Sequence, residues 1–200
     1  ELAELLGLPV AGPIGELGTW SIPFPTRHPL FLGPRLRTMR FPGDVDVHLN
    51  IGSRIAELAA KGARLISIRQ DAESLARVEP VDLGMVADVR LATIDLIAAV
   101  KSMATATRLK QIATARAART HEYTSQNAKL RESIIGEIGN GPAIRRERLA
   151  VELEAALEKD TIYVSDCDSG RAMNPLMSFG GDDKTYVATG PNILGWAAAA

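Results

Sequence analysis

The fold class of this sequence is indicated most clearly by Gly62-Ala-Arg-Leu-Ile-Ser-Ile-Arg-Gln-Asp71. Its β-branched and apolar residues from Ala63 to Ile68 follow a glycine and predict a buried strand. An earlier run, Val45 to Ile51, predicts another strand, and Val86 to Asp88 predicts a short third one. The apolar residues that follow recur mostly at helical spacing: Leu91, Ile94, Leu96, Ile97 and Val100. Short strands that alternate with helices predict an α/β fold with a parallel sheet.

The residues before this core predict a short helix, a strand and a long loop. Leu2 to Leu6 predicts the end of a helix that Gly7 stops. Leu8 to Ala11 predicts a short strand. Residues 12–44 are rich in glycine and proline and lack a helical period, so we expect a long loop there.

The residues after the core change in character. Residues 113–141 are largely polar and end in Gly-Asn-Gly directly before Pro142, which predicts an inter-domain linker with some helix. A second unit is expected to begin at residue 142. Its first predicted element is an amphipathic helix that starts near Pro142 and includes Leu149, Leu153 and Leu157. Two strands are expected after it, at Thr161–Ser165 and Tyr186–Thr189. A last helix is expected to begin at Leu194.

Composition and charge argue against several classes of partner. The chain has 200 residues, of which 46% are hydrophobic and 24% charged, as in ordinary globular proteins. Its formal net charge of -1 provides no general attraction to nucleic acid or to a membrane surface, so we expect neither as a partner. No apolar run reaches the roughly 18 residues that span a bilayer. The single cysteine, Cys167, predicts a reducing compartment, and we expect a cytoplasmic protein.

Two segments carry residues suited to chemistry. His28 lies in Phe24-Pro-Thr-Arg-His-Pro-Leu-Phe-Leu-Gly33, where prolines stiffen the chain around a side chain that can carry protons near neutral pH. The alternative is a structural turn histidine. Asp166-Cys-Asp-Ser-Gly170 follows a predicted strand at its carboxyl end, where open α/β sheets bind ligands. It begins like a calcium loop, but Met177 stands where a glutamate is required, so we expect no calcium site of that kind there. The alternative is that the segment is only a turn.

The order of these segments resembles thiamine-diphosphate-dependent enzymes of the acetolactate synthase group, and within it the benzoylformate decarboxylase branch. Six segments carry the resemblance: residues 2–10, 24–33, 46–52, 62–71, 161–170 and 190–197, the last reading Gly-Pro-Asn-Ile-Leu-Gly-Trp-Ala. It implies a central Rossmann-like domain without its first strand at residues 1–112, the linker at 113–141, and the start of an α/β diphosphate-binding domain at 142–200. We therefore expect an internal piece of a longer protein that alone binds neither cofactor nor magnesium tightly.

The resemblance also implies roles for individual residues. His28 matches a histidine that relays protons at the substrate. Leu194 matches the bulky apolar residue that forces the cofactor to bend, and Asn192 matches the residue whose backbone carbonyl holds the aminopyrimidine. The turn that faces the diphosphate is matched by Asp168, Ser169 and Gly170.

The implied activity is decarboxylation of a small-molecule 2-oxo acid by thiamine diphosphate, with Mg²⁺ ligands that lie outside this chain. The implied assembly is a homodimer or homotetramer. Two alternatives stay open. One is a carboligase like acetolactate synthase, with a flavin (FAD) on the central domain. The other is a non-catalytic domain that binds a nucleotide or only assembles subunits, because the family has glycines where this chain has Asn192 and Ile193.

Overall fold

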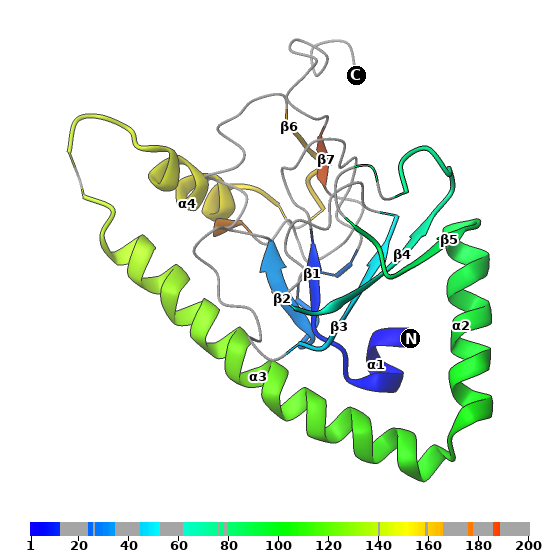
Figure 1. Cartoon of the computed structure of the whole chain (residues 1–200). Helices are drawn as coiled ribbons and strands as arrows, with labels where there is room; N and C mark the ends of the chain where they lie inside the picture. Colours follow the sequence, from blue (N-terminus) through cyan, green and yellow to red (C-terminus); the bar gives the residue numbers. More distant parts are fainter. Residues whose placement is uncertain are drawn as a thin grey trace. The chain divides into compact units, whose positions relative to one another are not determined.

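The chain forms two compact units, drawn in sequence colours in Figure 1. Unit 1 comprises Glu1–Leu8 with Phe41–Ala117, and unit 2 comprises Pro9–Arg40 with Ala118–Ala200. The computed structural model describes residues 1–12, 24–25, 27–34, 45–52, 62–75, 77, 80–139, 141–158, 160–165, 176–177 and 186–188.

Unit 1 is built on a three-stranded parallel sheet in the order β3-β4-β5. The strands are β3 (Val47–Ile51), β4 (Arg64–Arg69) and β5 (Leu83–Val86). The central strand β4 is the most buried of the three, and its Ile68 is only 1% exposed. The register pairs Ile51 with Ile68 and Arg69 with Val86, so all three strands end at one edge. The parallel sheet confirms the predicted α/β fold class and the strands predicted at Val45–Ile51 and Ala63–Ile68.

The third strand lies earlier than the sequence indicated. β5 ends at Val86, and Asp88 is instead the N-cap of helix α2 (Val89–Met103), where its carboxylate accepts a hydrogen bond of 2.9 Å from the Leu91 N–H. Gly84 lies in the middle of β5 and weakened the sequence signal for a strand. A Cβ at Gly84 would lie 2.5 Å from the Leu75 side chain, so the glycine accommodates a close approach.

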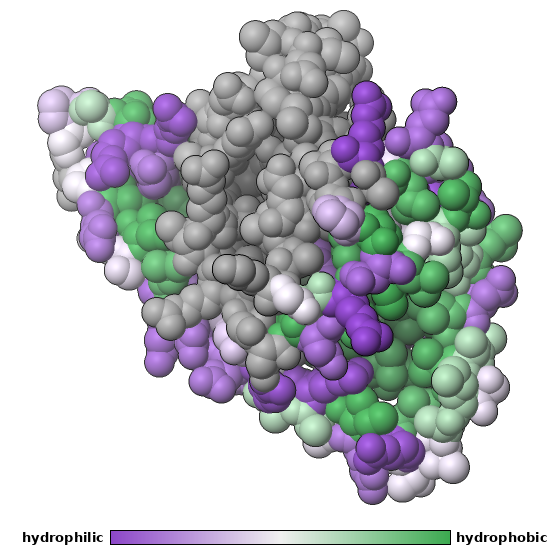
Figure 2. Space-filling view, in the orientation of Figure 1, coloured by the Kyte–Doolittle hydropathy of each residue, from purple (hydrophilic) through white to green (hydrophobic). Residues whose placement is uncertain are grey.

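Helix α2 confirms the predicted helix after the sheet but leaves an apolar face exposed. No residue of α2 is buried. The exposed large apolar residues of β5 and α2 are Leu83, Val86, Leu91, Ile94 and Met103. Figure 2 shows hydrophobic residues gathered over this part of the surface. A contiguous apolar patch is typical of surfaces that pack against further protein.

Two strand pairs, both parallel, belong to unit 2. β1 (Val10–Gly12) pairs with β2 (Phe31–Pro34), and β6 (Tyr163–Ser165) pairs with β7 (Tyr186–Ala188). β2 corrects the prediction of a continuous loop over residues 12–44. The apolar run Leu30-Phe31-Leu32 is too short to show a period, but all three residues are buried because β2 pairs with a strand about twenty residues away in sequence.

Helices α3 (Ala106–Gly136) and α4 (Arg146–Ala156) follow α2 in the chain. α3 is 31 residues long, and its alanine-rich first half has a strong helix propensity. Thr120 and Asn127 on this helix are buried, so it is packed more closely than a linker composition indicates. α4 begins four residues after Pro142 and ends before Leu157. The division of the chain at residues 112 and 141 stays a prediction.

Unit 2 has its own apolar core, into which α3 and α4 contribute residues. Phe31, Ala150, Leu176 and Met177 form the buried cluster. The partly buried residues packed against it are Phe24, Ile134, Ile135, Leu153 and Tyr163. Phe24 and Phe31 belong to the same short stretch of sequence as His28, so the packing of these two side chains helps to hold the histidine segment in place.

Candidate functional site

His28 lies in two consecutive tight turns immediately before β2. Its N–H donates a hydrogen bond of 3.1 Å to the Pro25 carbonyl, and its own carbonyl accepts one of 2.9 Å from the Phe31 N–H. Pro29 occupies the second position of the later turn, where the fixed φ of proline is favoured. The Phe-Pro-Thr-Arg-His-Pro segment is therefore closed by local backbone hydrogen bonds.

The imidazole ring of His28 is held in one tautomer by this turn. Its Nδ1 accepts a hydrogen bond of 3.2 Å from the Leu30 N–H, and a nitrogen that accepts carries no proton. In the neutral ring the proton is therefore on Nε2. The Phe24 ring meets the imidazole edge to face, with centroids 5.0 Å apart. A half-buried histidine with a defined Nε2–H is the arrangement that proton transfer to a bound molecule needs.

The histidine turn is attached to the interior of unit 2 through β2 and α3. The Val10 N–H of β1 donates to the Leu30 carbonyl at 2.8 Å. The buried Asn127 side chain on α3 donates through Nδ2 to the Leu32 carbonyl at 3.1 Å. Arg131, one helical turn further, donates to the Leu176 carbonyl. α3 thus supplies polar side chains that satisfy buried carbonyls of two separate segments.

We expect Asn127→Leu to lower the free energy of unfolding by about 1–3 kcal/mol, because it leaves the Leu32 carbonyl buried without this donor. Thermal unfolding measures the effect as a lower midpoint. The matched control is Gln126→Leu, whose side chain makes an exposed hydrogen bond to Glu122 and should change stability by less than about 0.5 kcal/mol. Equal effects of the two substitutions would contradict the role of Asn127.

The residues predicted to bind the cofactor follow two strands that are neighbours. β6 and β7 are parallel, and Ser165 pairs with Ala188. Asp168, Ser169 and Gly170 follow β6 in sequence, whereas Asn192 and Leu194 follow β7. All five lie outside the described residues. Adjacent strands are about 4.8 Å apart, so both segments leave the sheet from neighbouring carboxyl ends, where α/β folds bind ligands. The roles of these five residues stay predictions.

A polar cluster on the sheet of unit 1 was not singled out from the sequence. Asn50 on β3 and Ser67 and Arg69 on β4 are all at most 5% exposed. The available signal was the spacing of Ser67 and Arg69, since residues two apart on a strand share a face. A serine and an arginine on the same face of a strand that is expected to be buried indicate a cluster of polar side chains inside the fold.

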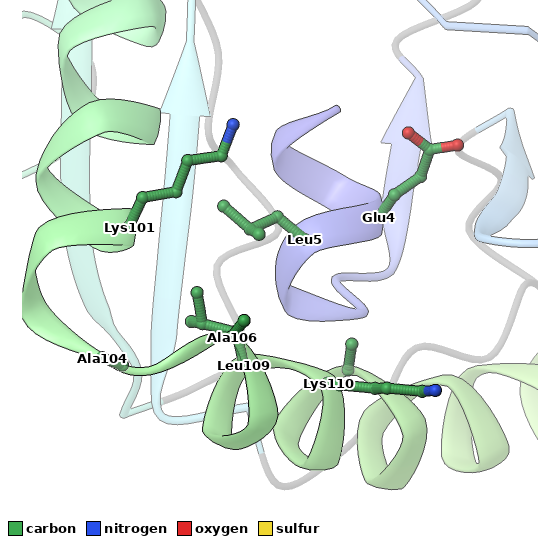
Figure 3. Close-up of a pocket in the computed structure, with 8 residues that line it drawn as sticks. Glu4, Leu5, Lys101, Ala104, Ala106, Leu109 and Lys110 are labelled. Carbon is green, nitrogen blue, oxygen red and sulfur yellow. The ribbon is translucent and has the colours of Figure 1, made fainter.

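Unit 1 also contains a pocket of about 460 Å³ beside α1 (Leu2–Leu6). It is lined by residues of α1, α2 and α3 and by the residue between the last two: Glu4, Leu5, Lys101, Ala104, Ala106, Leu109, Lys110 and Ala113. Figure 3 shows the amino groups of Lys101 and Lys110 pointing in different directions. Lys101 also binds the Glu1 carboxylate at 2.7 Å, and this hydrogen bond lowers the pKa of Glu1. Because its charged groups do not converge, we do not assign chemistry to this pocket.

Two kinds of feature are absent from the part of the chain that the structure describes. No described helix is both long enough and apolar enough to cross a bilayer. The described His, Cys, Asp and Glu side chains form no group of three or more that could hold a metal ion.

Comparison with solved structures finds the same fold in thiamine-diphosphate-dependent enzymes. One is the 4-hydroxybenzoylformate decarboxylase of Rhodococcus jostii RHA1, with a TM-score of 0.52 and 20% identity over 94% of this chain. Another, from Mycobacterium smegmatis, is assigned to the thiamin diphosphate-dependent enzymes and gives a TM-score of 0.53 and 18% identity over 98% of this chain. At these identities the likeness establishes the fold. No protein-family profile and no curated protein matches the chain.

The chain spans about a third of the length of these structures, namely 33% of the first and 36% of the second. The likeness therefore covers nearly all of this chain but only a part of each complete enzyme. It confirms the resemblance seen in the six sequence segments at the level of the fold.

Proposed function

We propose that this chain is part of a thiamine-diphosphate-dependent enzyme that decarboxylates a 2-oxo acid. The observation that carries the proposal is the parallel pairing of β6 with β7, with Ser165 beside Ala188. The segments that resemble the cofactor-binding turn and the cofactor entry loop follow these two strands. A shared site for one cofactor requires that the two segments start close together, and the strand pairing meets this requirement.

In this proposal the residues after β6 and β7 bind the cofactor. The turn with Ser169 and Gly170 would offer backbone N–H groups and a hydroxyl to the diphosphate, and Leu194 would be the bulky apolar residue that holds the cofactor in its bent shape. Thiamine diphosphate supplies the electron sink that allows carbon dioxide to leave. The Mg²⁺ that neutralises the diphosphate takes its ligands from outside this chain.

His28 holds or moves a proton at the substrate in this proposal. The Leu30 N–H keeps the His28 Nδ1 unprotonated, so the exchangeable proton of the neutral ring is on Nε2. The prolines and the Phe24 ring restrict the imidazole, which lowers the entropy cost of aligning it with a bound molecule. The described geometry of His28 is compatible with this role and supports it.

The test is to supply the full-length protein that contains this chain with thiamine diphosphate and Mg²⁺ and to measure carbon dioxide release from a panel of 2-oxo acids. We expect release from at least one aromatic or aliphatic 2-oxo acid and tight cofactor binding in calorimetry. The isolated 200-residue chain should bind the cofactor far more weakly. Absence of thiamine diphosphate binding to the full-length protein would contradict the proposal.

The carboligase alternative differs in the fate of the product and in a second cofactor. It predicts condensation of the substrate with a second carbonyl compound and, where a flavin is present, FAD absorbance in the purified full-length protein.

We also propose that the full-length protein is a homodimer or homotetramer. The exposed apolar face of β5 and α2, with Leu83, Val86, Leu91 and Ile94, supports packing against further protein. Light scattering of the full-length protein measures its mass.

A further inference from the structure

Two consecutive turns bring aromatic side chains together around His28. The first turn is closed by the hydrogen bond of 3.1 Å from the His28 N–H to the Pro25 carbonyl. Phe24 precedes this turn, and its ring centroid lies 5.0 Å from that of the imidazole, with the two planes at 77°. The second turn leads to Phe31, whose ring is stacked on that of Phe24 with centroids 6.1 Å apart. Phe24 therefore contacts both the imidazole and a residue of the core.

The prolines restrict the backbone around His28 but do not fix the orientation of its ring. Rotation of a histidine ring about its last side-chain bond has a broad and roughly two-fold profile, so a rigid turn still permits several orientations. The hydrogen bond from the Leu30 N–H to Nδ1 is 3.2 Å long, at the upper end of the usual range. The contact with Phe24 adds a second restraint on the ring, because edge-to-face aromatic pairs have a preferred geometry.

Phe24 is itself held by the core of unit 2. Phe31, on which it stacks, is 7% exposed and belongs to the buried cluster with Ala150, Leu176 and Met177. Phe24 packs against this cluster and is half-buried. Side chains in protein interiors are densely packed in defined rotamers, so a ring that packs against the core has a defined orientation. Two aromatic side chains thus connect the half-buried imidazole to the interior.

We propose that Phe24, backed by Phe31, is a positioning residue that keeps the His28 imidazole aligned with Nδ1 toward the Leu30 N–H. Phe24 exchanges no proton and acts only through His28. Loss of its ring leaves the two turns closed but allows the imidazole to rotate away from the Leu30 N–H. The expected effect on turnover rests on the proposed function, whereas the alignment of the ring can be measured without cofactor or substrate.

The first test measures kcat, KM and thiamine diphosphate affinity of the full-length protein in two variants. Phe24→Leu keeps an apolar side chain without a ring, and Phe24→Tyr keeps the ring. We expect Phe24→Leu to lower kcat about three- to tenfold, the size of one aromatic pair expressed as a rate, with KM and cofactor affinity within about twofold. Phe24→Tyr should restore kcat to within about twofold of the wild type. In a His28→Ala background, Phe24→Leu should have no further effect, because it acts through the imidazole.

Leu153→Ala is the control for a general loss of core packing. Leu153 lies on α4 and packs against the same buried cluster as Phe24. Its truncation should lower the unfolding midpoint at least as much as Phe24→Leu does, because it removes buried methyl groups. We expect kcat of Leu153→Ala to stay within about twofold of the wild type. Equal losses of kcat in Leu153→Ala and Phe24→Leu would mean that Phe24 only stabilises the core, and the proposal would be wrong.

The second test follows the imidazole of the full-length protein in the absence of cofactor. Diethyl pyrocarbonate acylates the unprotonated nitrogen of a neutral imidazole, which in His28 is the Nδ1 that accepts from the Leu30 N–H. Peptide mass spectrometry measures the rate at His28, with the exposed His121 as an internal reference. We expect roughly threefold or faster modification of His28 in Phe24→Leu, and wild-type rates in Phe24→Tyr and Leu153→Ala.

The two tests separate failure of this inference from failure of the proposed function. Equal modification rates of His28 in the wild type and all three variants would overturn the inference, whether or not any 2-oxo acid is decarboxylated. A wild-type protein that releases no carbon dioxide would count against the proposed function instead, and the modification rates would still decide whether Phe24 aligns the ring.

Discussion

We expect replacement of His28 by alanine to slow the proposed decarboxylation by the full-length protein by about 10²- to 10⁴-fold, the usual contribution of a positioned proton-transfer group. The reason is local. The Leu30 N–H occupies Nδ1, the ring is half-buried, and alanine leaves no group that can hold a proton at Nε2. The measurement is kcat and KM for the 2-oxo acid that the panel identifies, together with thiamine diphosphate affinity. Cofactor affinity should be unchanged, because the proposed cofactor residues follow other strands.

The matched control is His121→Ala. His121 is an exposed residue of α3 in the same unit, and its removal should leave kcat within about twofold of the wild type. Substitution of His28 by glutamine tests the proton itself, because glutamine keeps a polar side chain that does not titrate. If His28→Ala and His28→Gln both turn over at the wild-type rate, His28 is a structural turn residue and the relay role is wrong.

Replacement of Gly7 by alanine should strongly destabilise the protein. Gly7 ends α1 with a φ of 62°, and the Leu8 N–H donates to the Ala3 carbonyl at 2.9 Å across this end. The left-handed conformation costs an alanine about 1–2 kcal/mol. A Cβ would also collide with the backbone of Ala113 on α3, which adds about 1–3 kcal/mol for the forced shift. We expect the unfolding midpoint to fall by roughly 5–15 °C in thermal denaturation.

Gly136→Ala is the control for this prediction, and its expected sign is opposite. Gly136 is the last residue of α3, and a Cβ there meets no atom within 4 Å. Alanine at such a helical position stabilises by about 0.4–1 kcal/mol, mainly because it restricts the unfolded chain. If the unfolding midpoint falls by a similar amount in both variants, the positive φ of Gly7 and its close approach to Ala113 do not explain the loss of stability, and the prediction is wrong.

Much of the fold could be predicted from short stretches of sequence. The strands at β3 and β4 are runs of β-branched and apolar residues bounded by Gly52 and Gly62, and α2 shows a helical period. The end of α1 at Gly7 could be predicted because glycine tolerates a positive φ.

Less of the candidate site than of the fold could be predicted from the sequence. His28 was singled out by its residue type and its prolines, but the hydrogen bond that sets its tautomer depends on the folded turn.

The parallel α/β class, the ends of several elements and the segments that resemble a thiamine-diphosphate enzyme could be read from the sequence, because periodicity, glycine position and motif order are local properties of the chain. The folded structure was needed to show that Phe31 to Pro34 form β2, that α3 is packed through Asn127, and that Arg69 is buried beside Ser67. These features depend on strand pairing, burial and hydrogen bonds between residues whose proximity no local pattern encodes.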